Sequence, residues 1–177
     1  MNITVYCGAS AGSEPIYEHK ASELGQWLAA HNITLVYGGG RTGLMGKLAN
    51  AVLANGGKAV GVIPEFLKTA EEVHTGLTQL ITVNTMSQRK DTMLQMGDAF
   101  IALPGGAGTL EEIAEAISAA RLGRHAKPCI LYNIHGCYDH LEKLFDHMVR
   151  AGFLNQAGRE KANFVTSIEG IEKILRR

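Results

Sequence analysis

The stretch Ala99-Phe100-Ile101-Ala102-Leu103-Pro104-Gly105-Gly106-Ala107-Gly108-Thr109-Leu110-Glu111-Glu112 passes from an apolar run into glycines and then into a helix-forming segment. An apolar run of this length predicts a buried strand, and the segment from Thr109 onward has the spacing of a helix. Backbone N–H groups at the start of a helix, together with the helix dipole, form a favourable site for phosphate. The stretch therefore predicts a strand–loop–helix unit that binds an anion.

The rest of the chain repeats this order of strand, loop and helix. Strand-like runs, most of them apolar throughout, are expected at 3–7, 33–37, 59–63, 80–83, 99–103, 128–132 and 164–166, and helix-period segments at 16–30, 44–54, 86–96, 109–122, 138–150 and 168–175. Continuous apolar strands are typical of sheets covered on both faces. This alternation predicts an α/β fold, a Rossmann-like doubly wound parallel sheet with helices on both faces. Ligands of such sheets bind at the carboxyl ends of the strands, so we expect the site in the loops that follow them.

Length and composition restrict the class of protein. The 177 residues fit a single domain spanning 1–177, and no linker, repeat or low-complexity segment divides them. The formal net charge is zero, which gives no reason to expect a nucleic-acid partner. No apolar run approaches the ~20 residues of a membrane-spanning helix, so no membrane partner is expected either.

The three cysteines, Cys7, Cys129 and Cys137, show no CxxC spacing. Cys7 and Cys129 fall in apolar strand-like runs, so buried thiols are expected. The N-terminal residues enter a strand at once, without a basic region followed by a long apolar stretch, and they predict no export signal. Together these features predict a cytoplasmic protein.

A further glycine-rich loop, residues 38–46, follows the predicted strand 33–37. It contains Gly38-x-Gly40-x-x-Gly43, the formal spacing of a dinucleotide-binding loop. However, the loop follows the second strand, and the next strand ends in Pro64-Glu65 rather than in an isolated acid. Three interpretations are open: binding of a nicotinamide dinucleotide, close packing of a helix on the sheet, and a contribution to a mononucleotide pocket.

The 104–108 loop is followed by a carboxylate that has two interpretations. Gly105, Gly106 and Gly108 are expected to permit positive φ and close approach of a ligand to the backbone, and Thr109 is expected to cap the following helix. Glu112 lies about one helical turn (roughly 5 Å) beyond the loop, near where C1′ of a bound nucleotide would sit. The spacing Thr109-x-x-Glu112 also fits a capping box, in which Glu112 only satisfies the Thr109 amide.

Another predicted helix starts with a basic pair, Arg89 and Lys90. Thr85 and Gln88 have the spacing of a capping pair at its start. The helix dipole disfavours cations near a helix N-terminus, so the pair needs compensation from a carboxylate or an anionic ligand. The alternative is a solvated surface pair. Glu111 also has an alternative to ligand binding, because the dipole favours an acid in the first turn of a helix.

Three motifs together resemble one family. In chain order they are Gly38-Gly39-Gly40-Arg41-Thr42-Gly43-Leu44-Met45-Gly46, then Met86-x-x-Arg89-Lys90, then Pro104-Gly105-Gly106-x-Gly108-Thr109-x-x-Glu112. They are similar to those of the Lonely Guy family, the cytokinin riboside 5′-monophosphate phosphoribohydrolases, whose members are often described as lysine decarboxylases. The similarity extends from Tyr6 to about Phe153.

The resemblance implies a Rossmann-like homodimer that hydrolyses the N-glycosidic bond of a nucleoside 5′-monophosphate, releasing a free base and ribose 5-phosphate without a cofactor. It assigns the catalytic pair to Arg89 and Glu112. Ala107 departs from the aromatic residue that the family often has at this position. Glu71 matches a substrate-contacting glutamate of the family, and its neighbour Glu72 is the alternative match. The expected substrate-binding residues are Ser10, Gly39, Arg41, Thr42, Glu71, Lys90, Gly105, Gly106, Gly108, Thr109 and Glu111.

A mechanism follows from these roles. Breaking an N-glycosidic bond builds positive charge on the ribose ring, which a nearby carboxylate stabilises. Glu112 is expected to stabilise that charge and orient the attacking water, and Arg89 to hold the ribose or phosphate and keep Glu112 ionised. The glycines and Thr109 would bind the phosphate. Two other classes stay open: a nicotinamide oxidoreductase that uses the 38–46 loop, and a nucleotide carrier or sensor without turnover.

Neither a metal site nor pyridoxal chemistry is expected. His140 and His147 share a helix face, but their spacing of seven residues is not the i, i+3 or i+4 spacing of metal ligands on a helix. A pyridoxal enzyme needs a Schiff-base lysine and an acid for the ring nitrogen, and a chain this short has little room to support that cofactor. Both adenine and an N6-prenylated adenine are compatible with the sequence as the base.

Overall fold

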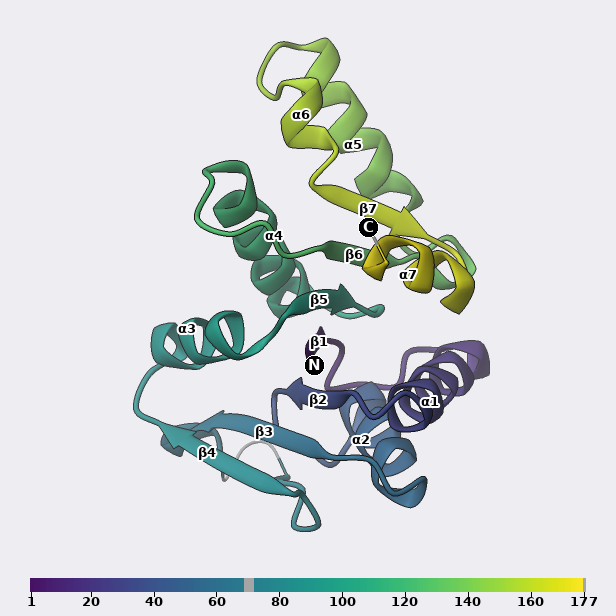
Figure 1. Cartoon of the computed structure of the whole chain (residues 1–177), viewed down its shortest axis with the longest axis vertical. Coiled ribbons are helices and arrows are strands. Elements are labelled where there is room, and N and C mark those ends of the chain that lie inside the picture. The colour runs from purple at the N-terminus through teal and green to yellow at the C-terminus, as the bar shows by residue number, and fades with distance from the viewer. Residues whose placement is uncertain (69–71, 177) are drawn as a thin grey trace.

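Seven strands form one parallel sheet in the computed structural model, which describes residues 1–68 and 72–176 (Figure 1). The strand order is β4-β3-β2-β1-β5-β6-β7, and every neighbouring pair is parallel. The doubly wound α/β fold predicted from the sequence is therefore confirmed. The strands are β1 (Asn2–Tyr6), β2 (Thr34–Tyr37), β3 (Ala59–Pro64), β4 (Gln79–Val83), β5 (Ala99–Ala102), β6 (Cys129–Tyr132) and β7 (Ala162–Val165).

Helices cover both faces of the sheet. The packing places α1, α2 and α7 on one face, and α3, α4 and α5 on the other (Figure 1). Each face has its own buried cluster: Ile3 and Val5 of β1 belong to the first, whereas Tyr6 belongs to the second. This follows from the alternation of side chains along a strand. The helices are α1 (Pro15–Ala30), α2 (Gly43–Ala54), α3 (Met86–Met96), α4 (Ala107–Arg121), α5 (Asp139–Arg150), α6 (Gln156–Arg159) and α7 (Ile168–Leu175), with 3-10 turns η1 (Glu65–Leu67) and η2 (Ile134–Gly136).

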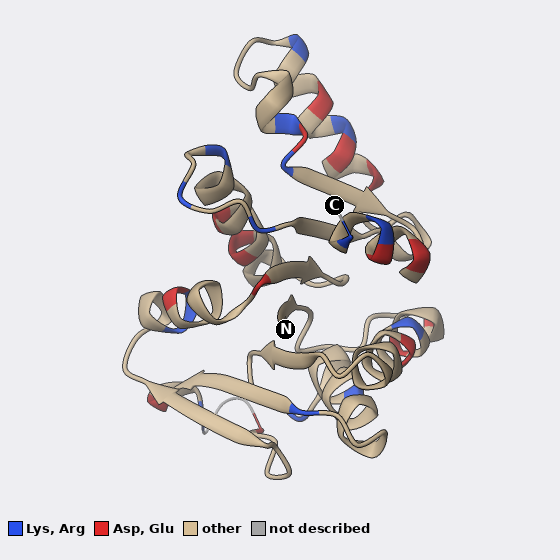
Figure 2. Cartoon of the chain, in the orientation of Figure 1, with Lys and Arg blue, Asp and Glu red and all other residues tan. Residues whose placement is uncertain are grey.

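Within the described chain, no charged residue lies in a strand, and Lys, Arg, Asp and Glu occupy the helices and connections (Figure 2). Strands that are covered on both faces require this composition. Strand β4 also lacks charged residues, but it lies at the edge of the sheet and is not covered: Gln79, Leu80 and Thr82 are exposed. The absence of charge in a strand therefore does not by itself show that both of its faces are covered.

The strand order reverses between β1 and β5. The chain places β2, β3 and β4 on one side of β1, and it then returns to place β5 on the other side. Connections that leave β1 and β5 therefore diverge, and a crevice forms between them at the carboxyl ends of these strands. The fold thus predicts a ligand site at this position, where the 104–108 loop also begins.

Most element boundaries agree closely with those predicted, but α6 was not predicted and α4 begins at Ala107 rather than Thr109. Cys7 and Cys129 are buried, as predicted, whereas Cys137 is exposed. Burial raises the pKa of the Cys129 thiol to about 12. Among the described helices, none combines the length and the apolar character needed to cross a bilayer.

Candidate active site

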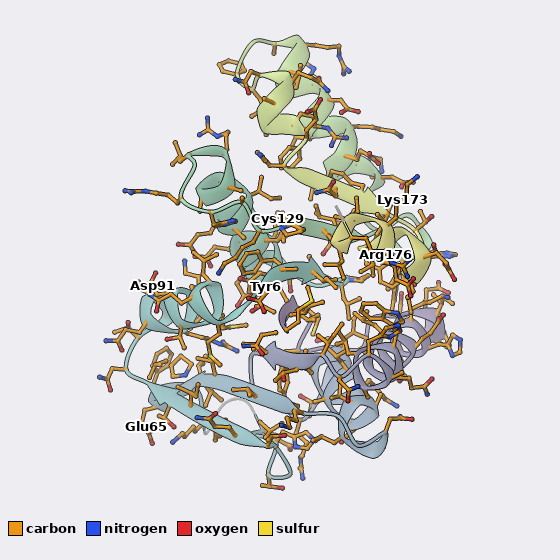
Figure 3. All side chains as sticks on the ribbon, viewed as in Figure 1. Tyr6, Glu65, Asp91, Cys129, Lys173 and Arg176 are labelled. Atoms are coloured by element: carbon orange, nitrogen blue, oxygen red, sulfur yellow. The ribbon has the colours of Figure 1, made fainter. Side chains whose placement is uncertain are left out.

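A cleft of about 660 Å³ opens at the carboxyl ends of β1 and β5. Its walls come from the connections and helices that follow β1 to β6, including α3 and α4, at the same edge of the sheet. Tyr6, the last residue of β1, lines the cleft and lies near the centre of the molecule beside β5 (Figure 3). A concave space of this size suits a small-molecule ligand.

Most residues that the sequence predicts to act on a nucleotide line this cleft. They are Ser10, Arg89, Gly105, Gly106, Gly108, Thr109, Glu111 and Glu112. Among the described residues, Gly39, Arg41, Thr42 and Lys90 do not line it, and Glu71 lies outside the described residues. The structure therefore brings the two expected catalytic residues and the 104–108 loop together.

The start of α4 differs from the prediction. The N-cap is Gly106, so Thr109 is the third residue of the helix, and the buried Thr109 side chain does not cap it. The predicted cap at Thr109 is wrong, because glycine at 106 adopts the extended conformation of an N-cap instead. The capping-box interpretation of Glu112 is also wrong, since that box requires Thr109 at the N-cap. Glu111 lies beyond the first turn, so the helix dipole does not explain it.

Close packing, rather than backbone conformation, requires a glycine at position 105. A Cβ atom at Gly105 would collide with Thr109 Oγ1 and would lie 2.9 Å from the Gly8 nitrogen. Gly105, Gly106 and Gly108 do not have positive φ, contrary to the prediction. A Cβ atom at Gly106 or Gly108 would meet no atom within 4 Å. These two glycines therefore leave the backbone of the cleft wall open to a ligand.

Glu112 lies half-buried on α4 and lines the cleft. Burial raises the pKa of the Tyr6 hydroxyl and of the Cys7 thiol, and the negative charge of Glu112 raises both further. Arg89 acts on Cys7 in the opposite direction. The Cys7 thiol is therefore protonated at neutral pH and does not serve as a nucleophile. Both charges, Glu112 and Arg89, act on the same buried end of β1.

Arg89 is buried, with 5% of the residue exposed, although it carries a charge. Its Nε donates to the Val62 carbonyl at 3.0 Å and its Nη2 donates to the Gly38 carbonyl at 2.8 Å. Backbone carbonyl dipoles of β3 and of the loop after β2 thus contribute to the compensation that this buried cation requires. The solvated-pair interpretation of Arg89 is wrong, because its guanidinium is fixed inside the cleft wall.

Gly38 provides the space for this guanidinium. A Cβ atom at Gly38 would collide with Arg89 Nη2 and would lie 2.9 Å from Met45 Sδ. The first glycine of the 38–46 loop is therefore explained by the placement of Arg89. Since Gly38 and Met45 also line the cleft, this loop contributes to the same site.

The middle of the 38–46 loop is engaged by residues 72–74. The Gly39 carbonyl accepts from the His74 amide at 3.0 Å, and the Arg41 amide donates to the Glu72 carbonyl at 2.7 Å. The Arg41 side chain also pairs with Glu72, with Nε 3.1 Å from Oε2. The Arg41 amide, one of the backbone donors that such a loop would offer to the pyrophosphate of a dinucleotide, is therefore already hydrogen-bonded.

Thr42 and Lys90 are also placed outside the cleft. Thr42 is the exposed N-cap residue of α2. Lys90 Nζ lies 2.7 Å from Glu111 and 3.2 Å from Glu115, and the hydrogen bond to Glu111 raises the pKa of Lys90. Lys90 therefore joins α3 to α4 beside the cleft.

Several cleft residues were not singled out from the sequence. They are mainly apolar or aromatic, and they include Tyr17, Met45, Leu67, Met93 and Cys137. Cys137 follows β6, so the rule that ligands bind beyond the strand ends could have identified it. The apolar residues have no such signal, because their pattern is that of a helix or strand packed in the core.

The residues of the cleft do not fit pyridoxal phosphate, since no lysine is among the described residues that line it. In the part of the chain that the structure describes, no group of three or more His, Cys, Asp or Glu residues is placed to hold a metal ion. The cleft instead combines a carboxylate, a fixed guanidinium and the start of a helix without a side-chain cap. This arrangement suits a ligand with an anionic group and a centre that becomes positively charged.

Comparison with known proteins gives a family. A family model described as "Possible lysine decarboxylase" matches residues 45–175. A cytokinin riboside 5′-monophosphate phosphoribohydrolase from Rhodococcoides fascians is 46% identical over 176 residues, which cover 99% of this chain and 89% of that protein. Cytokinin riboside 5′-monophosphate phosphoribohydrolase LOG1 from Arabidopsis thaliana is 46% identical over 157 residues, which cover 89% of this chain and 74% of that protein. The chain belongs to the Lonely Guy family.

Solved structures with lower sequence identity share the fold of this Lonely Guy protein. The molybdenum cofactor carrier protein from Chlamydomonas reinhardtii has a TM-score of 0.76 at 23% identity, and the match covers 99% of this chain and 98% of that chain. The molybdenum cofactor binding protein from Rippkaea orientalis has a TM-score of 0.72 at 22% identity, with 99% and 94% covered. These similarities concern the fold alone.

The contact between residues 72–74 and the 38–46 loop predicts a pH-dependent stability. His74 Nδ1 accepts from the Gly76 amide at 3.0 Å, which leaves the proton on Nε2, 3.0 Å from Asn50 Oδ1. Burial lowers the pKa of His74 below its ordinary value, and Arg41 lowers it further. The unfolded chain therefore binds a proton first as the pH falls through about 6.5, and the free energy of unfolding decreases.

Replacing His74 with Gln is expected to make the free energy of unfolding less dependent on pH between about 7.5 and 5.5. Denaturant unfolding of both proteins across this range measures the difference. Burial also lowers the pKa of His125, but this residue is present in both proteins, so its contribution to the pH dependence cancels in the comparison. Equal pH slopes for the two proteins would contradict the role of His74.

Proposed function

We propose that this protein hydrolyses the N-glycosidic bond of adenosine 5′-monophosphates, including those with an N6 substituent, to the free base and ribose 5-phosphate. Relatives named cytokinin riboside 5′-monophosphate phosphoribohydrolase, at 45% and 46% identity, support this activity. The structural observation that supports it most is the meeting of Glu112 and buried Arg89 with the 104–108 loop in one cleft. In this proposal residues 1–177 act as one domain around the cleft.

The 5′-phosphate would bind where the 104–108 loop enters α4. Gly106 and Gly108 leave the backbone open, and no side chain caps the first turn of α4 in the described structure. The helix dipole and the first backbone N–H groups then favour a phosphate. Ser10, which also lines the cleft, would add a hydroxyl. Binding of the phosphate would hold the sugar in position for the reaction.

Glu112 would act on the sugar ring. As the C1′–N9 bond breaks, its electron pair goes to the base, and positive charge develops on C1′ and the ring oxygen. The carboxylate stabilises that charge and orients a water molecule, whose oxygen forms the new bond to C1′. One proton of the water is lost to the solvent and N9 of the base gains one, so that atoms and charge balance.

Arg89 would hold the substrate and keep Glu112 ionised. A cation near a carboxylate favours its charged form, and Arg89 is fixed by the carbonyls of Gly38 and Val62. Fixed charges stabilise a transition state without reorganising during the reaction. Glu111 lines the cleft and would also contact the substrate, whereas Gly39, Arg41, Thr42 and Lys90 would support the site from outside the cleft. The expected contact of Glu71 with the substrate stays a proposal.

Incubation of the purified protein with AMP and with N6-isopentenyl-AMP, followed by chromatography of the products, tests the proposal. Release of base from either nucleotide is the expected result. A nucleotide that binds but stays intact would indicate a carrier or sensor. A change in nicotinamide fluorescence on mixing, without base release, would indicate an oxidoreductase.

Replacing Glu112 with Gln is expected to lower kcat by at least ~100-fold while nucleotide binding is largely kept, because the carboxylate charge acts on the transition state. Glu18→Gln is a matched control, since Glu18 lies on α1 and pairs with Lys47 at the surface. Steady-state rates of base release measure both variants. Activity of Glu112→Gln near that of the unaltered protein would assign Glu112 a structural role only.

Replacing Gly38 with Ala is expected to lower kcat/KM at least ~10-fold, because the added Cβ displaces the Arg89 guanidinium. Arg89→Ala is expected to impair both KM and kcat. Adding Gly38→Ala to Arg89→Ala should then have little further effect, since residues that act through one group are not additive. Additive losses in this double-mutant cycle would show that Gly38 acts independently of Arg89.

We also propose that the protein is a cytoplasmic homodimer. Met86, which lines the cleft, and Leu110 lie near the starts of α3 and α4 and are 37% and 42% exposed. A second copy covering them would remove apolar surface from water. The three free thiols support a reducing compartment. Sedimentation equilibrium of the purified protein gives the oligomeric state, and a monomer at micromolar concentration would contradict the proposal.

A further inference from the structure

The end of β5 is held by two hydrogen bonds that depart from the regular sheet pattern. Leu103 N donates to the Tyr6 carbonyl at 2.9 Å, as in the parallel β1–β5 ladder. Continuing that ladder would direct the Gly8 amide to the Leu103 carbonyl. Instead, Gly8 N donates to the Pro104 carbonyl at 3.1 Å, and the Tyr138 hydroxyl donates to the Leu103 carbonyl at 2.7 Å. At this point the chain leaves the sheet and becomes the 104–108 loop.

Tyr138 is itself fixed by a polar network. The residue is buried, and its amide donates to Asn133 Oδ1 at 2.7 Å. Asn133 Nδ2 donates to Asp139 Oδ1 at 2.7 Å, and Asn133 N donates to the Val165 carbonyl of β7 at 2.7 Å. The network therefore ties Tyr138 to the sheet, so its hydroxyl is a rigid donor rather than a mobile one.

The backbone before Tyr138 adopts an uncommon conformation. His135 has φ 53° and Gly136 has φ 73°, both in the left-handed region. A non-glycine residue persists there only when the surrounding structure compensates for the strain. The turn lets the chain that leaves β6 place Tyr138 against the end of β5. Neither His135 nor Tyr138 is among the described residues that line the cleft.

We propose that Tyr138 is a positioning residue, which fixes the 104–108 loop and through it the 5′-phosphate of the substrate. This inference rests on the proposed function. Without the hydroxyl, the buried Leu103 carbonyl loses this donor, and the adjoining residues shift toward another partner or toward water. Pro104, Gly105 and Gly106 line the cleft immediately beyond that carbonyl. A small displacement there weakens phosphate binding more than it alters the groups around C1′.

The chain contains a matched control for this hydroxyl. Tyr132, at the end of β6, is fully buried, and its hydroxyl has no hydrogen-bond partner among the described residues. Tyr132→Phe and Tyr138→Phe therefore remove the same atom from buried tyrosines six residues apart. Only the second removes a hydrogen bond to the strand that leads into the cleft.

The experiment compares both variants with the unaltered protein in hydrolysis of AMP and in inhibition by ribose 5-phosphate. In Tyr138→Phe, KM for AMP and the inhibition constant are expected to rise about tenfold while kcat changes less than about threefold. In Tyr132→Phe all three are expected to stay unchanged. Thermal unfolding of each variant accompanies the assay, since a merely structural role would lower the unfolding temperature without moving KM or the inhibition constant of the folded protein.

A second variant keeps the test informative if Tyr138→Phe does not fold. Asp139→Ala removes an exposed partner of Asn133, and a rise of about threefold in both constants is expected. Constants for Tyr138→Phe equal to those of Tyr132→Phe would overturn the inference. Failure of the proposed function is a different result, because the unaltered protein itself would then release no base. In that case the affinity for ribose 5-phosphate, measured by calorimetry for the unaltered protein and for Tyr138→Phe, would still test whether Tyr138 positions the phosphate site.

Discussion

The buried guanidinium of Arg89 is the constraint on which the rest of the site depends. A cation that is 5% exposed requires compensation, and the carbonyls of Gly38 and Val62 contribute it from the sheet itself. These two hydrogen bonds are made by the protein alone, so they hold the cation in place in the absence of a ligand. The capped start of α3, where Gln88 N donates to Thr85 Oγ1 at 3.1 Å, places Arg89 within reach of these carbonyls.

The cleft around Arg89 contains charged groups beside groups that stay neutral. Tyr6 and Cys7, at the end of β1, are held neutral by burial and by the charge of Glu112. Electrostatic interactions are stronger in such surroundings than in water, because fewer solvent dipoles oppose them. A carboxylate in the cleft wall therefore stabilises a developing positive charge better than the same group on an open surface does. Burial at the end of β1 thus both completes the packing of the sheet and strengthens the electrostatic interactions of the site.

The sequence predicted the elements of the fold well, because strand and helix periods are local. The family resemblance singled out Arg89 and Glu112, and both line the cleft, while their catalytic roles stay a proposal. The start of α4 was wrong, since Thr109 is a good N-cap residue and only tertiary structure shows that Gly106 takes that place. The carbonyls that compensate Arg89 lie 27 and 51 residues away in the chain, so no local pattern could identify them. Tyr138 was hidden for the same reason, because its partner Leu103 lies 35 residues earlier.

The glycines of the two loops show why spacing alone misled the prediction of backbone conformation. Gly38 and Gly105 are required because another group occupies the space of a Cβ atom: the Arg89 guanidinium at one, and Thr109 at the other. Gly106 and Gly108 are the opposite case, with empty space beside them that a ligand can enter. The sequence pattern did not separate these cases, because it treated Gly105, Gly106 and Gly108 alike, as residues that permit positive φ. In the folded protein they divide into glycines that let the protein pack on itself and glycines that let a ligand reach the backbone, and the cleft exists because both kinds occur where β1, β2 and β5 end together.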